Sequence, residues 1–167
     1  MEDLSVRKIL LAVSVMMFCS LGAFAQTGAQ VSFGYSHFTS DRNGWDLAGA
    51  MNGEHWAGEA DLGAYYAKDG NNIYSYMFGP KYRWGTGDVD KSWNPFAHFL
   101  LGGARVSSSA FNPSDTSLAF GIGGGTEYKF NDAFGGEAKL DWIHTNLNGS
   151  GQGHFRLGAG LVYHFGK

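Results

Sequence analysis

The residues best suited to chemistry lie in the second half of the chain. Glu137, Lys139 and Asp141 alternate along one segment, so a strand would place all three on one face. Two carboxylates held close together can act as the general acid and the general base of a catalytic site. A packed interior gives a substrate no access to them, however, and a structural network of charges is the better interpretation. We therefore predict no catalytic residue and no enzyme.

Two further patterns could bind a metal ion or a phosphate group. His154 and His164 lie ten residues apart, which places them at opposite ends of one strand. Gly121–Gly125 has the glycine content of a phosphate-binding loop, but it falls within a strand-like segment and no helix follows it. The histidines are better interpreted as loop-edge or interfacial residues, and we predict no metal and no cofactor.

The composition is unusual for a soluble enzyme. Of the 167 residues, 16% are charged, 16% are aromatic and 26 are glycine. Soluble domains have about one quarter charged residues. The net charge of −3 gives no reason to expect a nucleic-acid partner. The length suggests a single folded domain.

Residues 1–25 are predicted to be a cleavable signal peptide. Arg7 and Lys8 precede the apolar run Leu10–Phe24, which is short for a membrane span of about 20 residues. Ala23 and Ala25 then form a small-x-small cleavage site.

Cleavage after Ala25 would leave Gln26 as the first residue of a mature domain over residues 26–167. The single cysteine, Cys19, lies within the signal segment. The mature chain is therefore expected to hold neither a disulfide nor a thiol nucleophile.

The mature chain alternates between large apolar and small or polar residues with a period of two. The alternation is clearest over 74–84, 118–130 and 154–165. Five weaker segments follow the same rule: Gln30–Phe38, Trp45–Met51, Trp56–Tyr66, Phe96–Val106 and Phe134–Thr145. Transmembrane strands need about 9–11 residues, and bacterial barrels have an even number of strands. The pattern predicts an all-β fold, an eight-stranded antiparallel up-and-down transmembrane β-barrel.

Charge placement distinguishes a membrane barrel from a soluble one. Within each predicted strand the charges share one parity, opposite to the large apolar residues. A soluble barrel has apolar residues inside, whereas here the apolar face would be outside, which fits lipid surroundings. We predict that these six basic and six acidic side chains pair in the lumen, beside Gly121, Gly123, Gly158 and Gly160, and leave no wide pore. The predicted lumen network is Asp46, Glu59, Asp61, Lys81, Arg83, Arg105, Glu127, Lys129, Glu137, Lys139, Asp141 and Arg156.

Two parts of the chain fit this scheme less well. In the segment 96–106, Phe99 shares its parity with Arg105 while His98 has the other, so a bulge that swaps parity is a possible solution. The connection 85–94 is long for a position where a short periplasmic turn is expected.

Aromatic residues mark the ends of the predicted strands. Tyr and Trp rings prefer the boundary between lipid chains and headgroups. We therefore predict two interfacial belts formed by Trp45, Trp56, Tyr66, Tyr74, Trp84, Tyr128, Trp142 and Tyr163.

The mature chain resembles the OmpA-like outer-membrane β-barrel proteins, the small porin-family β-barrel domain. The stretches that carry the resemblance are Gly44–Leu47, Tyr74–Trp84, Pro95–His98, Phe120–Glu127, Leu140–Trp142 and Gly160–Phe165. The resemblance implies insertion by the outer-membrane assembly machinery, which reads an aromatic-ended last strand. Here Phe165 is followed by Gly166 and Lys167, which departs from that pattern.

Some barrels of this size are enzymes that modify lipid A. The deacylases among them use a His and a Ser that lie two residues apart on the lipid-facing surface. The nearest segments here, His37–Ser40 and His144–Asn146, do not match that arrangement. The main hypothesis is a bacterial outer-membrane barrel with a structural or surface-interaction role, in contact with outer-membrane lipid. The alternatives are a narrow minor pore, a lipid-modifying enzyme and a soluble lipocalin-like carrier, which would need an apolar interior.

Overall fold

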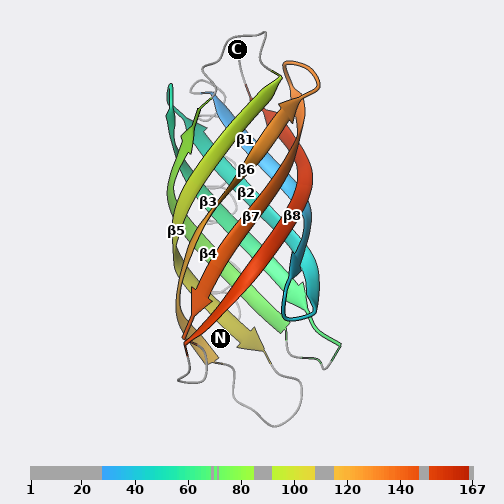
Figure 1. Cartoon of the computed structure of the whole chain (residues 1–167), viewed down its shortest axis with the longest axis vertical. Helices are drawn as coiled ribbons and strands as arrows, with labels where there is room; N and C mark the ends of the chain where they lie inside the picture. The colour runs from blue at the N-terminus through green and yellow to red at the C-terminus, as the bar shows by residue number, and fades with distance from the viewer. Residues whose placement is uncertain are drawn as a thin grey trace, which may run out of the picture.

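The chain folds into one closed barrel of eight antiparallel strands, with β1 pairing to β8 to complete the wall (Figure 1). The computed structural model describes residues 28–68, 70, 72–84, 92–107, 115–146 and 151–165. The strands are β1 (Ala29–Phe38), β2 (Arg42–Asn52), β3 (Trp56–Tyr66), β4 (Asn72–Arg83), β5 (Trp93–Ser107), β6 (Asp115–Lys129), β7 (Phe134–Thr145) and β8 (Gln152–His164). The predicted fold class is confirmed. Among these residues no helix is long and apolar enough to cross a membrane.

Apolar alternation locates the strands well and their ends less well. The predicted bounds of β3 and β7 coincide with the observed ones. By contrast, β2 begins at Arg42, three residues before its expected start, and β5 begins at Trp93. Polar end residues join the hydrogen-bonded ladder without continuing the apolar pattern. Arg42 pairs with Phe38 across a tight connection in which Asp41 has a φ of 56°.

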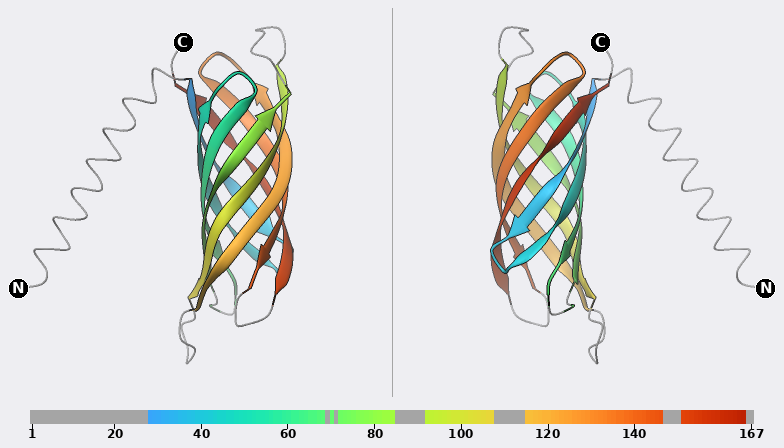
Figure 2. Two further views of the ribbon diagram at one scale, coloured as in Figure 1. Left: turned by 90° about the vertical axis from the view of Figure 1, so that its left-hand side faces the viewer. Right: turned by 90° about the vertical axis from the view of Figure 1, so that its right-hand side faces the viewer.

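The two ends of the barrel differ in their connections (Figure 2). One end, here called the terminal end, carries the start of β1, the end of β8 and the connections 53–55, 84–92 and 130–133. The other, here called the loop end, carries 39–41, 67–71, 108–114 and 146–151. The longest connection, between β4 and β5, is therefore at the terminal end, where the sequence also predicts an unusually long one.

The barrel buries most of its strand charges and exposes many large apolar side chains on its outer wall. Buried and exposed side chains alternate along the strands, as in β3 and β4. Large apolar side chains face outward and are widely exposed, Leu118 by 79% and Phe78 by 68%. Charged side chains such as Asp61 and Arg156 are fully buried. This polarity suits a barrel surrounded by lipid and is the reverse of a soluble one.

The register of β5 settles which way this strand faces. Its pairing with β4 and β6 runs without a shift, so the bulge considered from the sequence is wrong. Phe96, His98 and Leu100 point inward, and Phe99 and Leu101 point outward. The sequence is ambiguous here because this strand carries large apolar residues on both faces.

Inward-facing glycines make room for the contents of the lumen. An added Cβ at Gly123 would collide with the Asp141 side chain and lie 2.6 Å from the Leu140 carbonyl oxygen. One at Gly158 would lie 3.1 Å from Lys139 Cε. At Gly160 the neighbouring backbone of β1 is itself too close for a side chain. The interior is thus fitted around particular charged side chains.

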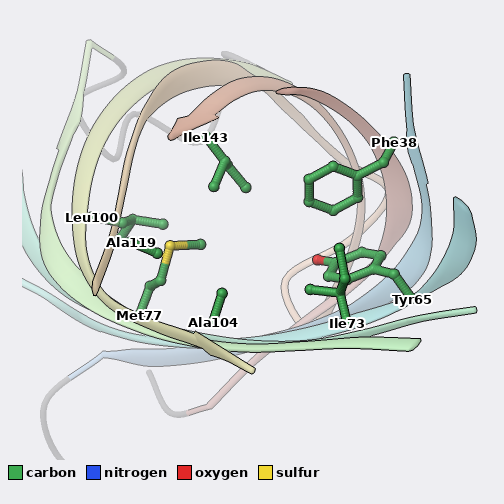
Figure 3. Close-up of a cluster of buried hydrophobic side chains, with 8 residues drawn as sticks. All are labelled: Phe38, Tyr65, Ile73, Met77, Leu100, Ala104, Ala119 and Ile143. Carbon is green, nitrogen blue, oxygen red and sulfur yellow. The ribbon is translucent and has the colours of Figure 1, made fainter. Parts of the chain in front are cut away.

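Apolar side chains fill the lumen at the loop end. Figure 3 shows that they point into the ring of strands from several sides. Several come from the ends of strands that border the loops: Phe38 closes β1, and Ile73 is the second residue of β4. The cluster comprises Phe38, Tyr65, Ile73, Met77, Leu100, Ala104, Ala119 and Ile143, with Val106 packed against it. We call it the loop-end apolar cluster.

Replacement of Gly123 by Ala is expected to lower barrel stability by about 1–3 kcal/mol, because backbone atoms of β7 block the new methyl group. The measurement is urea unfolding in detergent micelles, followed by tryptophan fluorescence. Gly58→Ala is the matched control, since nothing lies within 4 Å of an added Cβ at this outward position. Equal midpoints for the two variants would contradict the close fit around Gly123.

Candidate functional site

A network of ion pairs occupies the lumen, and Arg156 of β8 lies at its centre. Its guanidinium contacts Asp61 through Nη1 at 2.7 Å and Asp141 through Nη2 at 2.6 Å. Nε also donates to Asp141 at 2.7 Å, and Nη1 to the Tyr65 hydroxyl at 3.0 Å. A fully buried guanidinium with this many partners is satisfied by the fork geometry that arginine provides.

Lys139 extends the network toward β1 and β2. Its Nζ lies 2.5 Å from Asp46 Oδ2 and 3.2 Å from Asp61 Oδ2. The Ser36 hydroxyl donates to the other Asp46 oxygen. Gly158 lies against the lysine stem, which explains why this inward position on β8 carries no side chain.

His98 and Lys81 extend the network toward the terminal end. The His98 Nδ1 lies 2.8 Å from Glu59 Oε1, and its Nε2 lies 2.8 Å from Asp141 Oδ1. Donation from both nitrogens requires the positively charged form of the ring. Lys81 Nζ contacts Glu59 at 2.9 Å and Glu137 at 3.2 Å. The same ammonium lies 3.8 Å from the centre of the Phe96 ring.

A second, smaller group of polar side chains lies nearer the terminal end. Glu127 of β6 contacts His164 of β8 at 2.7 Å. Arg83 donates to Gln30 Oε1 at 3.4 Å and to the Gly53 carbonyl at 3.2 Å. Gln30 also accepts a hydrogen bond from Asn52. Every strand of the barrel thus contributes to one of the two polar groups.

The structure brings nine of the twelve charges expected in the lumen into buried positions. These are Asp46, Glu59, Asp61, Lys81, Glu127, Glu137, Lys139, Asp141 and Arg156. Arg83 is half-buried near the terminal end. Lys129 has the inward parity but ends β6, where its side chain is exposed.

Arg105 does not belong to the lumen. It shares the outward parity of Phe99 and Leu101 on β5, and its side chain is exposed. The prediction that it points inward is wrong, because β5 continues without the change of parity that it would require. The expected balance of six basic and six acidic side chains therefore does not describe the lumen, where histidines provide part of the pairing.

Sequence reasoning missed several side chains that complete the network. The interpretation of the histidines as loop-edge or interfacial residues is wrong for His98, which is buried between Glu59 and Asp141 in the lumen. Tyr65 and Ser36 are fully buried donors or acceptors that resemble ordinary strand residues in the sequence. Their contribution depends on cross-barrel distances, which period-two alternation does not encode.

Such a network has a clear energetic logic. An isolated charge in a narrow, water-poor lumen is costly, and several close partners offset that cost. Each carboxylate of the central network has at least one cationic partner within 4.0 Å. Among the described residues, no group of three or more His, Cys, Asp or Glu side chains is arranged to hold a metal ion. The ion pairs thus link strands across the lumen.

The predicted interfacial aromatics all point outward. All eight are at least partly exposed: Trp45, Trp56, Tyr66, Tyr74, Trp84, Tyr128, Trp142 and Tyr163. At the terminal end they join further rings that the sequence did not single out, in the groups Trp56–Tyr82–Trp84, Trp93–Tyr128–Phe130 and Phe134–Tyr163–Phe165. The signal-cleavage residues Ala23, Ala25 and Gln26 lie outside the described residues.

Replacement of Arg156 by Gln is expected to destabilise the barrel by about 3–5 kcal/mol, because Asp61 and Asp141 lose their central partner in a buried site. Urea unfolding in detergent micelles measures the change. Lys129→Gln removes one positive charge from an exposed strand end and is the control. A loss as small as that of the control would show that Arg156 does not stabilise the lumen.

Comparison with known proteins finds solved structures that share this architecture. No family model matches the chain, and no curated protein matches it. Among solved structures, the N-terminal β-barrel domain of Pseudomonas aeruginosa OprF matches with a TM-score of 0.66 and 18% identity, over 83% of this chain and 98% of that one. Neisserial surface protein A (NspA) matches with a TM-score of 0.61 and 14% identity, over 81% and 94%. Ail, the attachment invasion locus protein of Yersinia pestis, matches with a TM-score of 0.51 and 16% identity, over 81% and 98%. This chain therefore shares the eight-stranded fold of these barrel proteins.

Proposed function

We propose that this protein is an integral β-barrel of the bacterial outer membrane with a structural or surface-interaction role. The carrying observation is the polarity of the wall, with paired charges inside and large apolar side chains outside. The likeness in fold to outer-membrane barrels supports this proposal, and so does the resemblance of its sequence to the OmpA-like family.

Export and assembly follow from the two ends of the mature chain. In this proposal residues 1–25 direct the chain across the inner membrane and are removed. The outer-membrane assembly machinery then recognises β8, whose end carries the packed rings of Tyr163 and Phe165. Both termini of the barrel lie at one end, which an even number of strands requires. We assign that end to the periplasm and the loop end to the cell surface.

The lumen of the proposed protein does not conduct ions. The central charges are engaged with one another at 2.5–3.2 Å in the pairs that link β2, β3, β4, β7 and β8. The loop-end apolar cluster adds a second barrier beyond them. An ion would have to displace several buried partners and then cross an apolar layer, both of which are energetically costly.

We propose that the protein has no catalytic activity. The carboxylates that could act as acid and base are Glu137 and Asp141, and both are sealed in the lumen. On the outer surface His37 is held by Asn43 at 2.8 Å, so its ring has a structural partner. The proposed role therefore rests on the barrel as an anchor, with outer-membrane lipid around it and short connections at the surface.

Expression of the full-length chain in a Gram-negative host tests this proposal. We expect the mature protein, beginning at Gln26, in the outer-membrane fraction, with a faster-migrating band in unheated gel samples that disappears on boiling. Intact-mass measurement and sequencing of the N-terminal peptide by mass spectrometry identify the N-terminus. Recovery in the soluble periplasmic fraction without such a band would overturn the membrane assignment and favour the soluble carrier.

Planar-bilayer recording distinguishes a closed barrel from a narrow pore. Purified protein, shown to be folded by its gel shift, is expected to give no unitary conductance, because the charge network and the loop-end apolar cluster block the lumen. The OprF barrel domain, prepared in the same way, is the control protein. Carbonate extraction of both proteins shows that each has inserted into the bilayer. Reproducible steps of one amplitude from this protein would support the minor pore instead.

A further inference from the structure

One strand cation, Arg105, faces the outer wall of the barrel instead of the lumen. Among the described strand residues, Arg105 is the one side chain with outward parity that carries a permanent charge. The other outward positions carry apolar, small or neutral polar side chains. A charge on the lipid-facing wall is costly near the middle of the bilayer and much less so at its edge. Its position along the strand is therefore informative.

Arg105 lies at the loop end of the barrel. It is two residues before Ser107, where β5 ends. Across the ladder it pairs with Tyr74 on β4, itself two residues after the start of that strand. On the other side it pairs with Thr116, the second residue of β6. All three positions lie near strand ends at the loop end, where the proposed membrane orientation would bring them close to the lipid headgroups.

The side chains around Arg105 offer hydrogen-bond donors. Tyr74 and Thr116 are exposed and face the same way as Arg105, and directly opposed residues have Cβ atoms about 4.5–5.5 Å apart. One step toward the bilayer centre, the ring and hydroxyl of Tyr76 lie over Gly103, which leaves no room for a side chain there. The patch therefore combines a guanidinium with three hydroxyl groups.

The surface beyond this patch is apolar. Leu118, which pairs with Gly103, is 79% exposed, and Leu101 is 45% exposed. A ligand that fits must present an anionic group with several hydrogen-bond acceptors at the barrel rim and hydrocarbon next to the apolar wall. A lipid phosphate has both parts, and arginine binds phosphate through two parallel hydrogen bonds.

We propose that Arg105, Tyr74, Tyr76 and Thr116 form a binding site for the phosphate group of a membrane lipid in the leaflet at the loop end. The inference rests on the proposed membrane location. It adds a specific lipid contact on one side of the wall, formed by β4, β5 and β6. A phosphomonoester lipid, with the larger negative charge, is the favoured ligand.

Native mass spectrometry of the folded barrel in a neutral detergent tests the site, with phosphatidic acid titrated against phosphatidylcholine. We expect a preference for phosphatidic acid that weakens about tenfold in Arg105→Gln, as the loss of charge-assisted hydrogen bonds implies. Arg105→Lys should keep part of the preference. Lys129→Gln removes the same charge at the terminal end and should leave binding unchanged. Inorganic phosphate should not compete, since it lacks the acyl chains that the apolar surface contacts.

Two results would overturn the site. One is equal binding of phosphatidic acid to the native protein and to Arg105→Gln. The other is an absence of any preference over phosphatidylcholine. Each variant is first shown to be folded and membrane-inserted by its gel shift and carbonate extraction. Failure of the native chain to insert would instead contradict the proposed membrane location.

Discussion

The constraint on which this barrel depends is that charges inside a narrow lumen must find partners across it. Arg156 on β8 meets Asp61 on β3 and Asp141 on β7, so the pairs span the barrel as well as neighbouring strands. Backbone hydrogen bonds hold each strand to its neighbours only. The lumen network adds links between strands that the ladder leaves unconnected, and it specifies which side chains can share the interior.

The same constraint explains the glycine content. A barrel of eight strands has room for side chains and little else. Where Lys139 passes β8 or Asp141 passes β6, the facing position is Gly158 or Gly123. Large side chains then lie on the outer wall, which faces lipid in the proposed membrane location. The low overall charge and the many aromatic residues both follow from this arrangement, with a small polar lumen inside and a large apolar wall outside.

Much of the fold could be predicted from the sequence, because a period of two is a direct consequence of strand geometry. It located all eight strands and the inward parity of most charges. It failed for Arg105, since β5 has large apolar residues on both faces and its parity alone could not be interpreted. The partners of each charge were also beyond prediction, because His98, Glu59 and Asp141 meet only once the barrel has closed.

Strand ends were the other weak point, for a related reason. Trp93 and Arg42 extend their strands through backbone pairing, which makes no demand on the side chain. The outer aromatic groups were predicted in part, since rings at strand ends are recognisable, but their grouping into contacts such as Trp93–Tyr128 depends on the register between strands.

The lumen network has a consequence for how this chain enters a membrane. Its members come from strands at both ends of the sequence, from Asp46 on β2 to Arg156 on β8. A partly inserted sheet would leave carboxylates and cations facing an open, apolar environment without their counterparts. Hairpins added one at a time to the bilayer would each carry that penalty. In the proposed membrane location, insertion of the strands and closure of the barrel are therefore expected to be coupled.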